Sequence, residues 1–236
     1  MNNTQKVAIV TGASQGLGEG IARAFLARGY RVLGTSRRIA ASNDPNYLTI
    51  AGDIGHPATG KALVEQALER FGRVDTLVNN AGIFIASPFT QYSAQQYQQM
   101  LATNLDGFFH TTQPAVEAML AQGGGHVVQI TTTLVDNANH NVPSVLASLT
   151  KGGLAAATRS LAIEYATRNI RVNAVSPGVI RTPMHPPHTH ATLAGLHPMQ
   201  RLGDVADITQ AVMYLEDAGF VTGEILHVDG GQVAGS

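Results

Sequence analysis

Residues 11–18 read Thr-Gly-Ala-Ser-Gln-Gly-Leu-Gly and lie between a short apolar run and the start of a helical pattern. Glycines in such a turn let the backbone come close to a pyrophosphate, which the unpaired N–H groups of the helix N-terminus stabilise. A glycine-rich turn without a ligand is the weaker alternative, because a strand precedes the turn and a helix follows it. We therefore expect a dinucleotide phosphate site formed by Gly12, Ser14, Gln15, Gly16, Leu17 and Gly18.

A second candidate for phosphate binding follows the next apolar run, where the chain reads Ser36-Arg37-Arg38. An acidic side chain at this point would accept a hydrogen bond from the ribose 2′-hydroxyl of NAD and repel a 2′-phosphate. Arginine instead binds phosphate through a bidentate fork. A solvated pair of arginines is the alternative. We expect the site to prefer NADPH or NADP, with NADH the less favoured cofactor.

Apolar runs and helical patterns alternate along the chain. The strands and helices that they predict must position the glycine turn and the Ser36-Arg37-Arg38 segment. Short apolar runs predict strands and 3.6-residue periodicity predicts helices. Strands are expected at 7–10, 31–35, 47–51, 76–78, 126–131, 171–175 and 225–228, and helices at 17–27, 56–71, 93–121, 144–166 and 204–215.

This alternation is typical of an α/β protein, and we expect one domain over residues 1–236. The expected architecture is a Rossmann fold, a doubly wound and mostly parallel sheet of about seven strands with helices on both faces. Ligands of such sheets bind at the carboxyl ends of the strands. Gly123, Gly124 and Gly125 are expected to form a turn and not a domain boundary, because the alternation continues through them.

Composition excludes several classes of protein. The net charge is −1 and no run of Lys or Arg occurs, so no nucleic-acid partner is expected. Cysteine is absent, which removes disulfides and thiolate metal sites. The N-terminus has no signal peptide pattern, and the longest weakly polar stretch, 142–163, contains Lys151 and Arg159. We expect a cytoplasmic protein with no membrane partner and a small-molecule substrate.

Further motifs follow the glycine turn, whose spacing is Gly-x3-Gly-x-Gly, in order along nearly the whole chain. They are Asp53-Ile54, Asn79-Asn80-Ala81-Gly82, Asn104, Pro177-Gly178-Val179-Ile180-Arg181-Thr182 and Asp229-Gly230-Gly231. Taken together, they resemble the short-chain dehydrogenase/reductase superfamily. The resemblance implies a homo-oligomer, either a tetramer or a dimer. It also implies that the cofactor contacts Asp53, Ile54, Asn80, Ala81, Gly82, Lys151, Pro177, Gly178, Ile180 and Thr182.

The resemblance implies hydride transfer between a nicotinamide and a carbonyl or alcohol carbon. In that chemistry a tyrosine moves the proton, and a lysine four residues later on the same helix face lowers the tyrosine pKa. Lys151 is in place, but Ala147 occupies the tyrosine position. Asn104 and Lys151 are expected in the catalytic site.

The family's serine position also differs in this chain. Thr132 is the best match, and its hydroxyl can still hydrogen-bond a substrate oxygen. The distance from Thr132 to Ala147 along the chain is slightly longer than the family norm, which indicates an insertion within 134–142. Thr131 and Thr133 therefore stay open as alternatives.

Alanine cannot transfer a proton, and general acid catalysis typically contributes about 10²–10⁴-fold. Ser144, Ser148, His140 and Lys151 are the groups that could substitute. For each of them a purely structural role is the competing interpretation. Lys151 could be the acid if burial lowers its pKa.

The segment 184–190 occupies the family's substrate-covering position and contains His185, His188 and His190. Imidazoles bind zinc and copper well, but prolines separate these three and no Asp, Glu or Cys lies nearby to complete a site. We expect no metal here and instead a polar lid that closes over the substrate.

Two functions fit this sequence. The first is an NADPH-dependent oxidoreductase that transfers a hydride to a carbonyl or quinone-like acceptor, with an atypical proton donor. The second is an NADP(H)-binding protein with weak or no turnover, acting as a sensor or as the structural partner of an active relative.

Overall fold

Seven parallel strands form one sheet in the computed structural model, which describes residues 5–235. The strand order is β3-β2-β1-β4-β5-β6-β7, so the order reverses between β1 and β4, where a ligand crevice is expected in such folds. The strands are β1 Val7–Thr11, β2 Arg31–Ser36, β3 Tyr47–Ala51, β4 Thr76–Asn79, β5 Gly125–Ile130, β6 Ile170–Pro177 and β7 Ile225–Val228.

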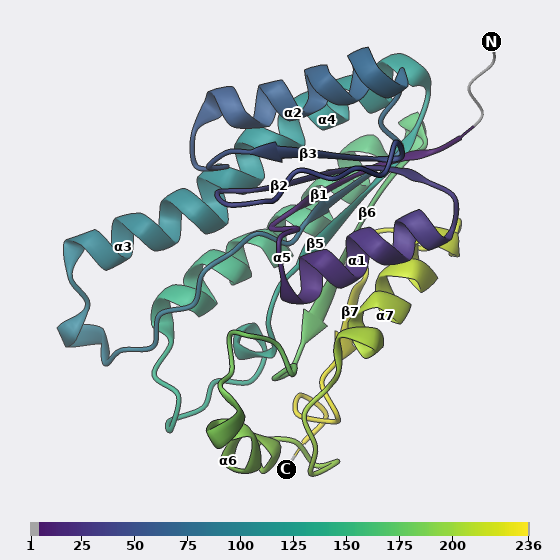
Figure 1. Cartoon of the computed structure of the whole chain (residues 1–236). Helices are drawn as coiled ribbons and strands as arrows, with labels where there is room; N and C mark the ends of the chain where they lie inside the picture. Colours follow the sequence, from purple (N-terminus) through teal and green to yellow (C-terminus); the bar gives the residue numbers. More distant parts are fainter. Residues whose placement is uncertain (1–4, 236) are drawn as a thin grey trace.

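Helices cover both faces of this sheet, as Figure 1 shows. Strands buried on both faces are continuous apolar runs, and all five residues of β1 are buried. The α-helices are α1 Gly16–Ala27, α2 Pro57–Phe71, α3 Ala94–Leu101, α4 Gly107–Gln122, α5 Val145–Tyr165, α6 His190–Ala194 and α7 Val205–Asp217.

Two apolar cores lie on the two sides of the sheet. On one side α2, α4 and α5 pack through residues such as Leu63, Met119 and Ala162. On the other side α1 and α7 pack through residues such as Phe25 and Ile208. The predicted doubly wound parallel sheet, with about seven strands and helices on both faces, is confirmed.

The helix expected over 93–121 is present, because residues 94–122 are helical without a break. It consists of α3, a π-helical turn at Ala102–Asp106 and α4. The apolar periodicity did not show the wider π-turn inside this helix. The expected ends of the other elements differ by one or two residues, and the helix expected at 204–215 extends to Asp217. The short helix α6, which begins at the last residue of the expected lid, was not predicted.

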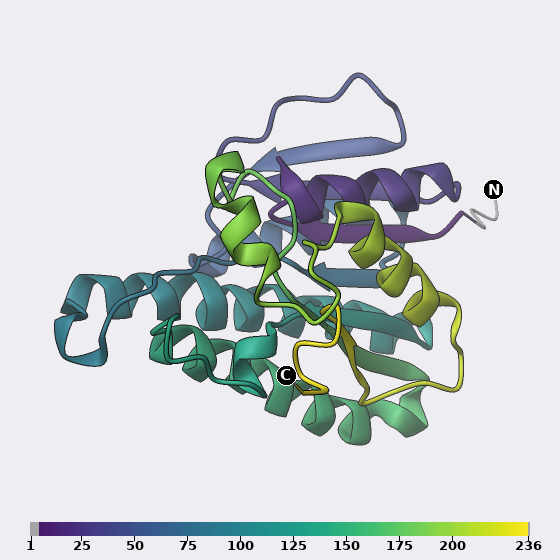
Figure 2. The same cartoon turned by 90° about the horizontal axis from the view of Figure 1, so that it is seen from below.

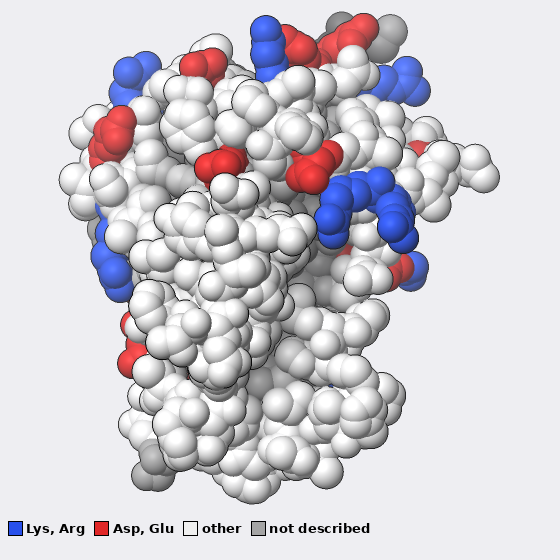
Figure 3. Space-filling model, turned by 90° about the vertical axis from the view of Figure 1, so that its left-hand side faces the viewer, with Lys and Arg blue, Asp and Glu red and all other residues white. Residues whose placement is uncertain are grey.

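The loops at the carboxyl ends of the strands form the functional edge of the molecule. The α6 segment and the C-terminus both lie at this end, and they are in front in the view from below (Figures 1 and 2). Figure 3 looks onto this edge and shows a hollow with few charges, beside which Lys and Arg side chains gather. In the described part of the chain, no helix is long and apolar enough to cross a membrane.

A buried carboxylate lies at the opposite, amino-terminal end of the sheet. Glu216 of α7 accepts hydrogen bonds from the Tyr30 hydroxyl (2.9 Å) and the Thr76 hydroxyl (3.0 Å), and it lies 2.8 Å from Nδ1 of His126. Burial acts to raise the pKa of Glu216, but these hydrogen bonds outweigh it and lower the pKa to about 2. Glu216 thus connects α7 to the starts of β4 and β5, far from the carboxyl edge.

Candidate active site

The glycine turn presents an uncapped helix N-terminus at the carboxyl edge. Gly12 and Gly16 have φ values of +69° and +60°, which glycine adopts without a steric penalty. Within residues 5–235, the backbone N–H groups of Gly16, Leu17 and Gly18 have no hydrogen-bond partner, and Gln15 does not cap the helix with its side chain. This arrangement fits a pyrophosphate, whose oxygens would accept from these N–H groups.

Asn80 joins the turn after β4 to the glycine turn. Its amide Nδ2 donates to the carbonyl of Thr11 at 2.9 Å, and the Thr11 hydroxyl accepts from the backbone N–H groups of Asn80 and Ala81 at 3.1 and 3.0 Å. These contacts hold 80–82 beside Gly12. The loop after β6 also closes on the turn, since a side chain on Gly16 would meet Thr182 at 3.4 Å. The structure thus brings the predicted phosphate residues together with Asn80, Ala81, Gly82 and Thr182.

The predicted ribose-phosphate residues lie at the end of β2. Arg37 and Arg38 are exposed, and neither guanidinium has a carboxylate partner among the described residues. The Ser36 hydroxyl accepts from the backbone N–H of Arg38 at 3.3 Å, which fixes the turn. Two unpaired cations beside a small hydroxyl can hold a phosphate group.

The predicted adenine-side residues follow β3. Asp53 accepts the backbone N–H of Gly55 at 3.0 Å through Oδ1. Ile54 is buried against the start of α4, where Gly107 leaves room for its side chain. Asp53 and Ile54 therefore lie at the same edge as the end of β2, because Ser36 pairs with Ala51 in the sheet.

The π-helical turn places Asn104 inside the site. Its Oδ1 accepts the backbone N–H of Ile83 at 2.9 Å, and its Nδ2 donates to the Ile83 carbonyl at 3.1 Å and to the Thr150 hydroxyl at 3.0 Å. All three contacts are buried or partly buried. Asn104 thereby joins the loop after β4 to α5, one residue before Lys151. π-Turns often occur at functional sites because the wider turn redirects a side chain.

Lys151 points from α5 to the ends of β4 and β5. Its Nζ donates to the carbonyl of Ile130 at 2.8 Å. A side chain on Gly82 would lie 3.0 Å from Lys151 Nζ and 3.2 Å from Asn104 Oδ1, so these three residues meet at one point. Desolvation lowers the pKa of Lys151 to about 8. The structure therefore brings Asn104, Gly82 and Lys151 together as a set.

The three candidate threonines after β5 differ in how their hydroxyls are used. Thr131 donates to the Val175 carbonyl at 3.1 Å, and Thr133 donates to Gln232 Oε1 at 3.0 Å. Thr132 only accepts, from the N–H of Leu134 at 3.4 Å, so within the described residues its own proton has no acceptor. Among the three, Thr132 is the one that could donate to a substrate oxygen.

Ala147 is 2% exposed and lies in a small apolar cluster with Met100 and Leu146. Ile83 and Tyr92 pack against the same cluster, and the Tyr92 hydroxyl donates to the carbonyl of Ile85. The proton of the Tyr92 hydroxyl therefore already has an acceptor, and the other side chains of this cluster are aliphatic or thioether groups.

The other three candidate proton donors are Ser148, His140 and Ser144. The Ser148 hydroxyl donates to the Leu134 carbonyl at 2.9 Å, so its proton already has an acceptor. His140 is exposed and lines a pocket of about 300 Å³ between residues 137–140 and 195–198. Ser144 is buried just before α5, and its side chain does not cap that helix. Lys151 is the candidate that has both burial and a lowered pKa.

One residue in the loop after β6 has a backbone N–H and a backbone C=O that both lack a hydrogen-bond partner. Gly178 N–H donates to the Val228 carbonyl, and Val179 N–H donates to Nε2 of His197 at 2.9 Å. Gly203 bonds to the loop on both sides of Ile180, through the Val179 carbonyl and the Arg181 N–H. Among the described residues, the N–H and C=O of Ile180 have no partner. Ile180 can thus offer one donor and one acceptor to a ligand.

The lid histidines do not converge. Nε2 of His190 lies 2.8 Å from the carbonyl of His185, and His188 is exposed. Desolvation and the nearby His190 lower the pKa of His185. Among residues 5–235, no three His, Asp or Glu side chains form a group that could hold a metal ion.

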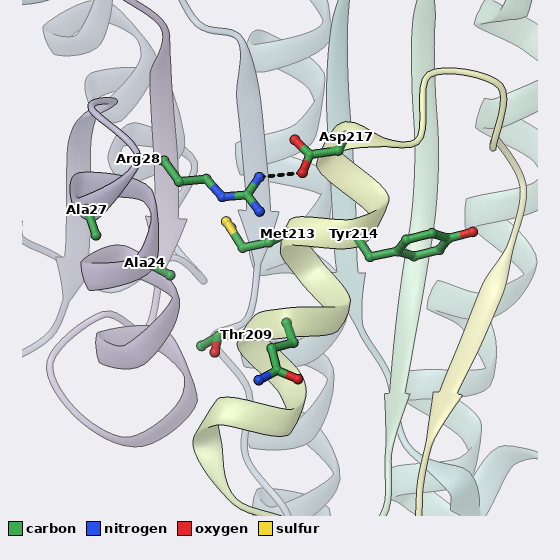
Figure 4. A pocket seen from close by; sticks show the side chains of 8 residues that line it. Ala24, Ala27, Arg28, Thr209, Met213, Tyr214 and Asp217 are labelled. Carbon is green, nitrogen blue, oxygen red and sulfur yellow. Dashed lines mark hydrogen bonds and ion pairs between the residues drawn. The ribbon is translucent and has the colours of Figure 1, made fainter.

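A surface groove of about 480 Å³ lies between α1 and α7 (Figure 4). The Arg28–Asp217 ion pair (2.7 Å) lies within it. The groove lies beside the last turn of α1. The glycine turn precedes the first turn of that helix, so the groove is away from it. The groove is not part of the candidate site.

Three residues of the site were not predicted from the sequence. Thr11 fixes the Asn80 turn, Thr150 is a partner of Asn104, and His197 accepts a hydrogen bond from the loop after β6. Polar residues next to predicted site residues were the available signal for Thr11 and Thr150. No local signal identified His197, because its partner lies 18 residues away.

The chain was compared with known proteins. The family model described as enoyl-(acyl carrier protein) reductase matches residues 12–232. The chain is 35% identical to the acetoacetyl-CoA reductase of Acinetobacter sp. over 243 residues, covering 96% of this chain and 97% of the relative. It is 35% identical to the 3-oxoacyl-(acyl-carrier-protein) reductase of Escherichia coli over 242 residues, covering 98% of each chain.

Solved structures share the fold of this chain over nearly its whole length. ElxO with bound NADP has a TM-score of 0.92 at 28% identity, covering 98% of this chain and 100% of that one. The 3-ketoacyl-(acyl-carrier-protein) reductase of Brucella melitensis, in complex with NADH, has a TM-score of 0.90 at 31% identity, with 98% and 100% covered. With the family model spanning most of its length and the fold shared throughout, the chain belongs to the short-chain dehydrogenase/reductase superfamily.

Proposed function

We propose that the chain binds NADPH at the carboxyl edge of the sheet. The uncapped start of α1 supports this for the pyrophosphate, and unpaired Arg37 and Arg38 support it for the 2′-phosphate. ElxO was solved with NADPH and with NADP, and the Brucella relative with NADH, so the resemblance alone does not decide between the two cofactors. The two arginines favour NADPH here, because an exposed guanidinium gains more from a dianionic phosphate than from a hydroxyl.

We propose that the protein is an oxidoreductase in which Lys151 replaces the missing tyrosine as proton donor. Bound NADPH would supply a hydride. Asn104 holds the loop at Ile83 and the helix at Thr150, and so fixes the approach to Lys151. The Thr132 hydroxyl is free to donate to the acceptor oxygen. Lys151, with its pKa lowered to about 8, gives up a proton far more readily at neutral pH than an ordinary lysine does.

The observation that carries this proposal is the position of the partly buried Lys151 beside Gly82 and Asn104. A carbonyl or quinone-like acceptor fits best, because an activated acceptor needs less help from an acid. Without the tyrosine, reduction of an ordinary ketone is expected to be slower by about 10²-fold or more.

A second function is favoured by one specific observation. Ala147 is enclosed by apolar side chains, so the usual proton donor is absent and its place is filled. An NADP(H)-binding protein with weak or no turnover, acting as a sensor or as the structural partner of an active relative, would have this arrangement.

One experiment separates the two functions. NADPH oxidation by the wild type and by Ala147→Tyr is measured side by side with aldehydes, ketones, activated dicarbonyls and quinones. Turnover of an activated acceptor by the wild type above about 1 s⁻¹ supports the enzyme. Activity of the tyrosine variant alone would support the binding protein, because the scaffold would then be competent and Ala147 would have silenced it.

We also propose that the chain forms a homo-oligomer. Apolar side chains are exposed on α4 and α5, including Phe109 (55%), Leu149 (53%) and Ile163 (79%). Phe220, after α7, is fully exposed close to the edge strand β7. Light scattering after size exclusion is expected to give a dimer or tetramer, and Ile163→Lys is expected to lower the assembly state if α5 lies in the interface.

A further inference from the structure

His197 lies where the end of the lid, the loop after β6 and the C-terminal turn meet. Its side chain is 2% exposed, and its Nε2 accepts the backbone N–H of Val179 at 2.9 Å. A Cβ on Gly178 would lie 2.7 Å from that nitrogen, and a Cβ on Gly230 would lie 3.3 Å from the Cβ of His197. The imidazole is therefore held tightly between two glycines.

The hydrogen bond to Val179 fixes the tautomer of this imidazole. Because Nε2 accepts, the ring proton lies on Nδ1. Nδ1 is buried and has no partner among the described residues. A buried N–H without an acceptor is destabilising, and an apolar side chain of similar size would avoid that cost. The lone pair of Nε2, more than the volume of the ring, therefore accounts for a histidine at this position.

That lone pair holds the peptide between Gly178 and Val179, and Gly203 holds the two peptides on either side of Ile180. With the Val179 N–H bonded to His197 and the Val179 carbonyl bonded to Gly203, the peptide groups beside Ile180 cannot rotate freely. The N–H and C=O of Ile180 are left unpaired. A primary carboxamide presents one acceptor and one donor, which complements this pair.

We propose that His197 is a positioning residue that holds the Val179–Ile180 backbone in the orientation that receives the carboxamide of the nicotinamide. This rests on the proposed NADPH binding. His197 also joins this loop to the turn after α6, since its N–H donates to the Ala194 carbonyl at 3.1 Å and its carbonyl accepts from the Gln200 N–H at 2.8 Å. The turn after α6 and the loop after β6 are thus linked by one residue.

The test compares two ligands that differ in the nicotinamide. NADP⁺ and 2′-phospho-ADP-ribose share the phosphates, and only the first carries the carboxamide. Their Kd values are measured by titration calorimetry for wild type, His197→Gln, His197→Asn and His197→Leu. Glutamine can place an oxygen at the position of Nε2, whereas asparagine is too short and leucine has no acceptor.

We expect His197→Asn and His197→Leu to bind NADP⁺ about tenfold more weakly, which corresponds to about 1.4 kcal/mol. We expect them to bind 2′-phospho-ADP-ribose as the wild type does, and His197→Gln to bind both ligands nearly normally. If leucine disrupts folding, as thermal melting would show, the Gln and Asn variants still make the comparison, because both are polar and differ by one methylene.

Equal weakening of both ligands, or no weakening of either, would overturn the role of His197 while NADPH binding stands. Failure of Gln to restore what Asn loses would also overturn it. Failure of the wild type to bind either ligand would instead refute the proposed function itself.

Discussion

Lys151 should make reduction slow down as the pH rises from 7 to 9. Burial lowers the pKa of its ammonium from 10.5 to about 8, and no carboxylate contributes to hold the proton. With that pKa, about nine-tenths of the lysine is protonated at pH 7 and about one-tenth at pH 9. If the ammonium is the proton donor, the rate falls about ninefold over this interval. A lysine with its ordinary pKa would show no fall before about pH 10.

The assay is the pH profile of kcat/KM for the acceptor at saturating NADPH, which reports the ionising groups of the enzyme form that meets the acceptor. Lys151→Arg is the matched variant, because it keeps a cation at the site but does not lose its proton below pH 12. The arginine variant is expected to be slow and to show no fall between pH 7 and 9. A flat wild-type profile, or the same fall in Lys151→Arg, would refute Lys151 as the donor.

The lowered pKa of Lys151 can also be tested without an activity assay, through the pH dependence of the free energy of unfolding. Because the pKa of Lys151 is lower in the folded than in the unfolded chain, the unfolded chain binds more protons between about pH 8 and 10.5. The free energy of unfolding should therefore rise with pH across this window, by up to about 3 kcal/mol. Denaturant titrations at pH 7.5 and 10 would measure the rise, which Lys151→Met should reduce. An equal rise in both proteins would show that other groups cause it.

Three further perturbations follow from the structure. Arg38→Ala should weaken NADPH binding by about tenfold and leave NADH binding nearly unchanged, because only the 2′-phosphate loses a partner; equal losses in paired fluorescence titrations would contradict this. Ala147→Tyr should lower the free energy of unfolding by about 1–3 kcal/mol, since the buried apolar cluster must open to admit the ring; denaturant melts measure this, and unchanged stability would show that space exists. Glu216→Gln should destabilise the fold by about 2 kcal/mol. The wild type should lose stability as the pH falls from about 4.5 towards 2, because the folded pKa of Glu216 is lowered to about 2. The glutamine variant has no carboxylate at this site and should not show that loss. Chemical unfolding at pH 7 and pH 3 tests this, and parallel losses in both proteins would contradict it.

Features that depend on nearby residues could be predicted from the sequence. The apolar run of β1 and the glycines after it specify a buried strand and a tight turn, and both were predicted. The order of strands and helices followed from the alternation, because each element carries its own period. The π-turn at Asn104 could not be predicted, because the contacts of this residue are with Ile83 and Thr150, which are distant in sequence.

The choice among three consecutive threonines also lay beyond the sequence. Adjacent residues with the same side chain differ only in what the fold places opposite them. Thr131 meets the Val175 carbonyl, and Thr133 meets Gln232, which is 99 residues further along the chain. His197 is a similar case. Its partner is the backbone N–H of Val179, and every residue except proline has such a group, so the sequence does not show which one a histidine will meet.

Ala147 and Lys151 point towards different functions, and the two observations do not carry equal weight. The apolar packing of Ala147 removes one proton donor, but it does not affect other groups at the site. Holding a ribose needs only a charged donor, which a lysine in contact with water provides without desolvation. Desolvation of the partly buried ammonium of Lys151 lowers its pKa to about 8, which still leaves it charged at pH 7 and able to hold a ribose. The same shift, which ribose binding does not need, brings the pKa near the pH at which a general acid works best. The state of Lys151 therefore favours an enzyme, with a lysine as acid in place of a tyrosine, over a protein that only binds its cofactor.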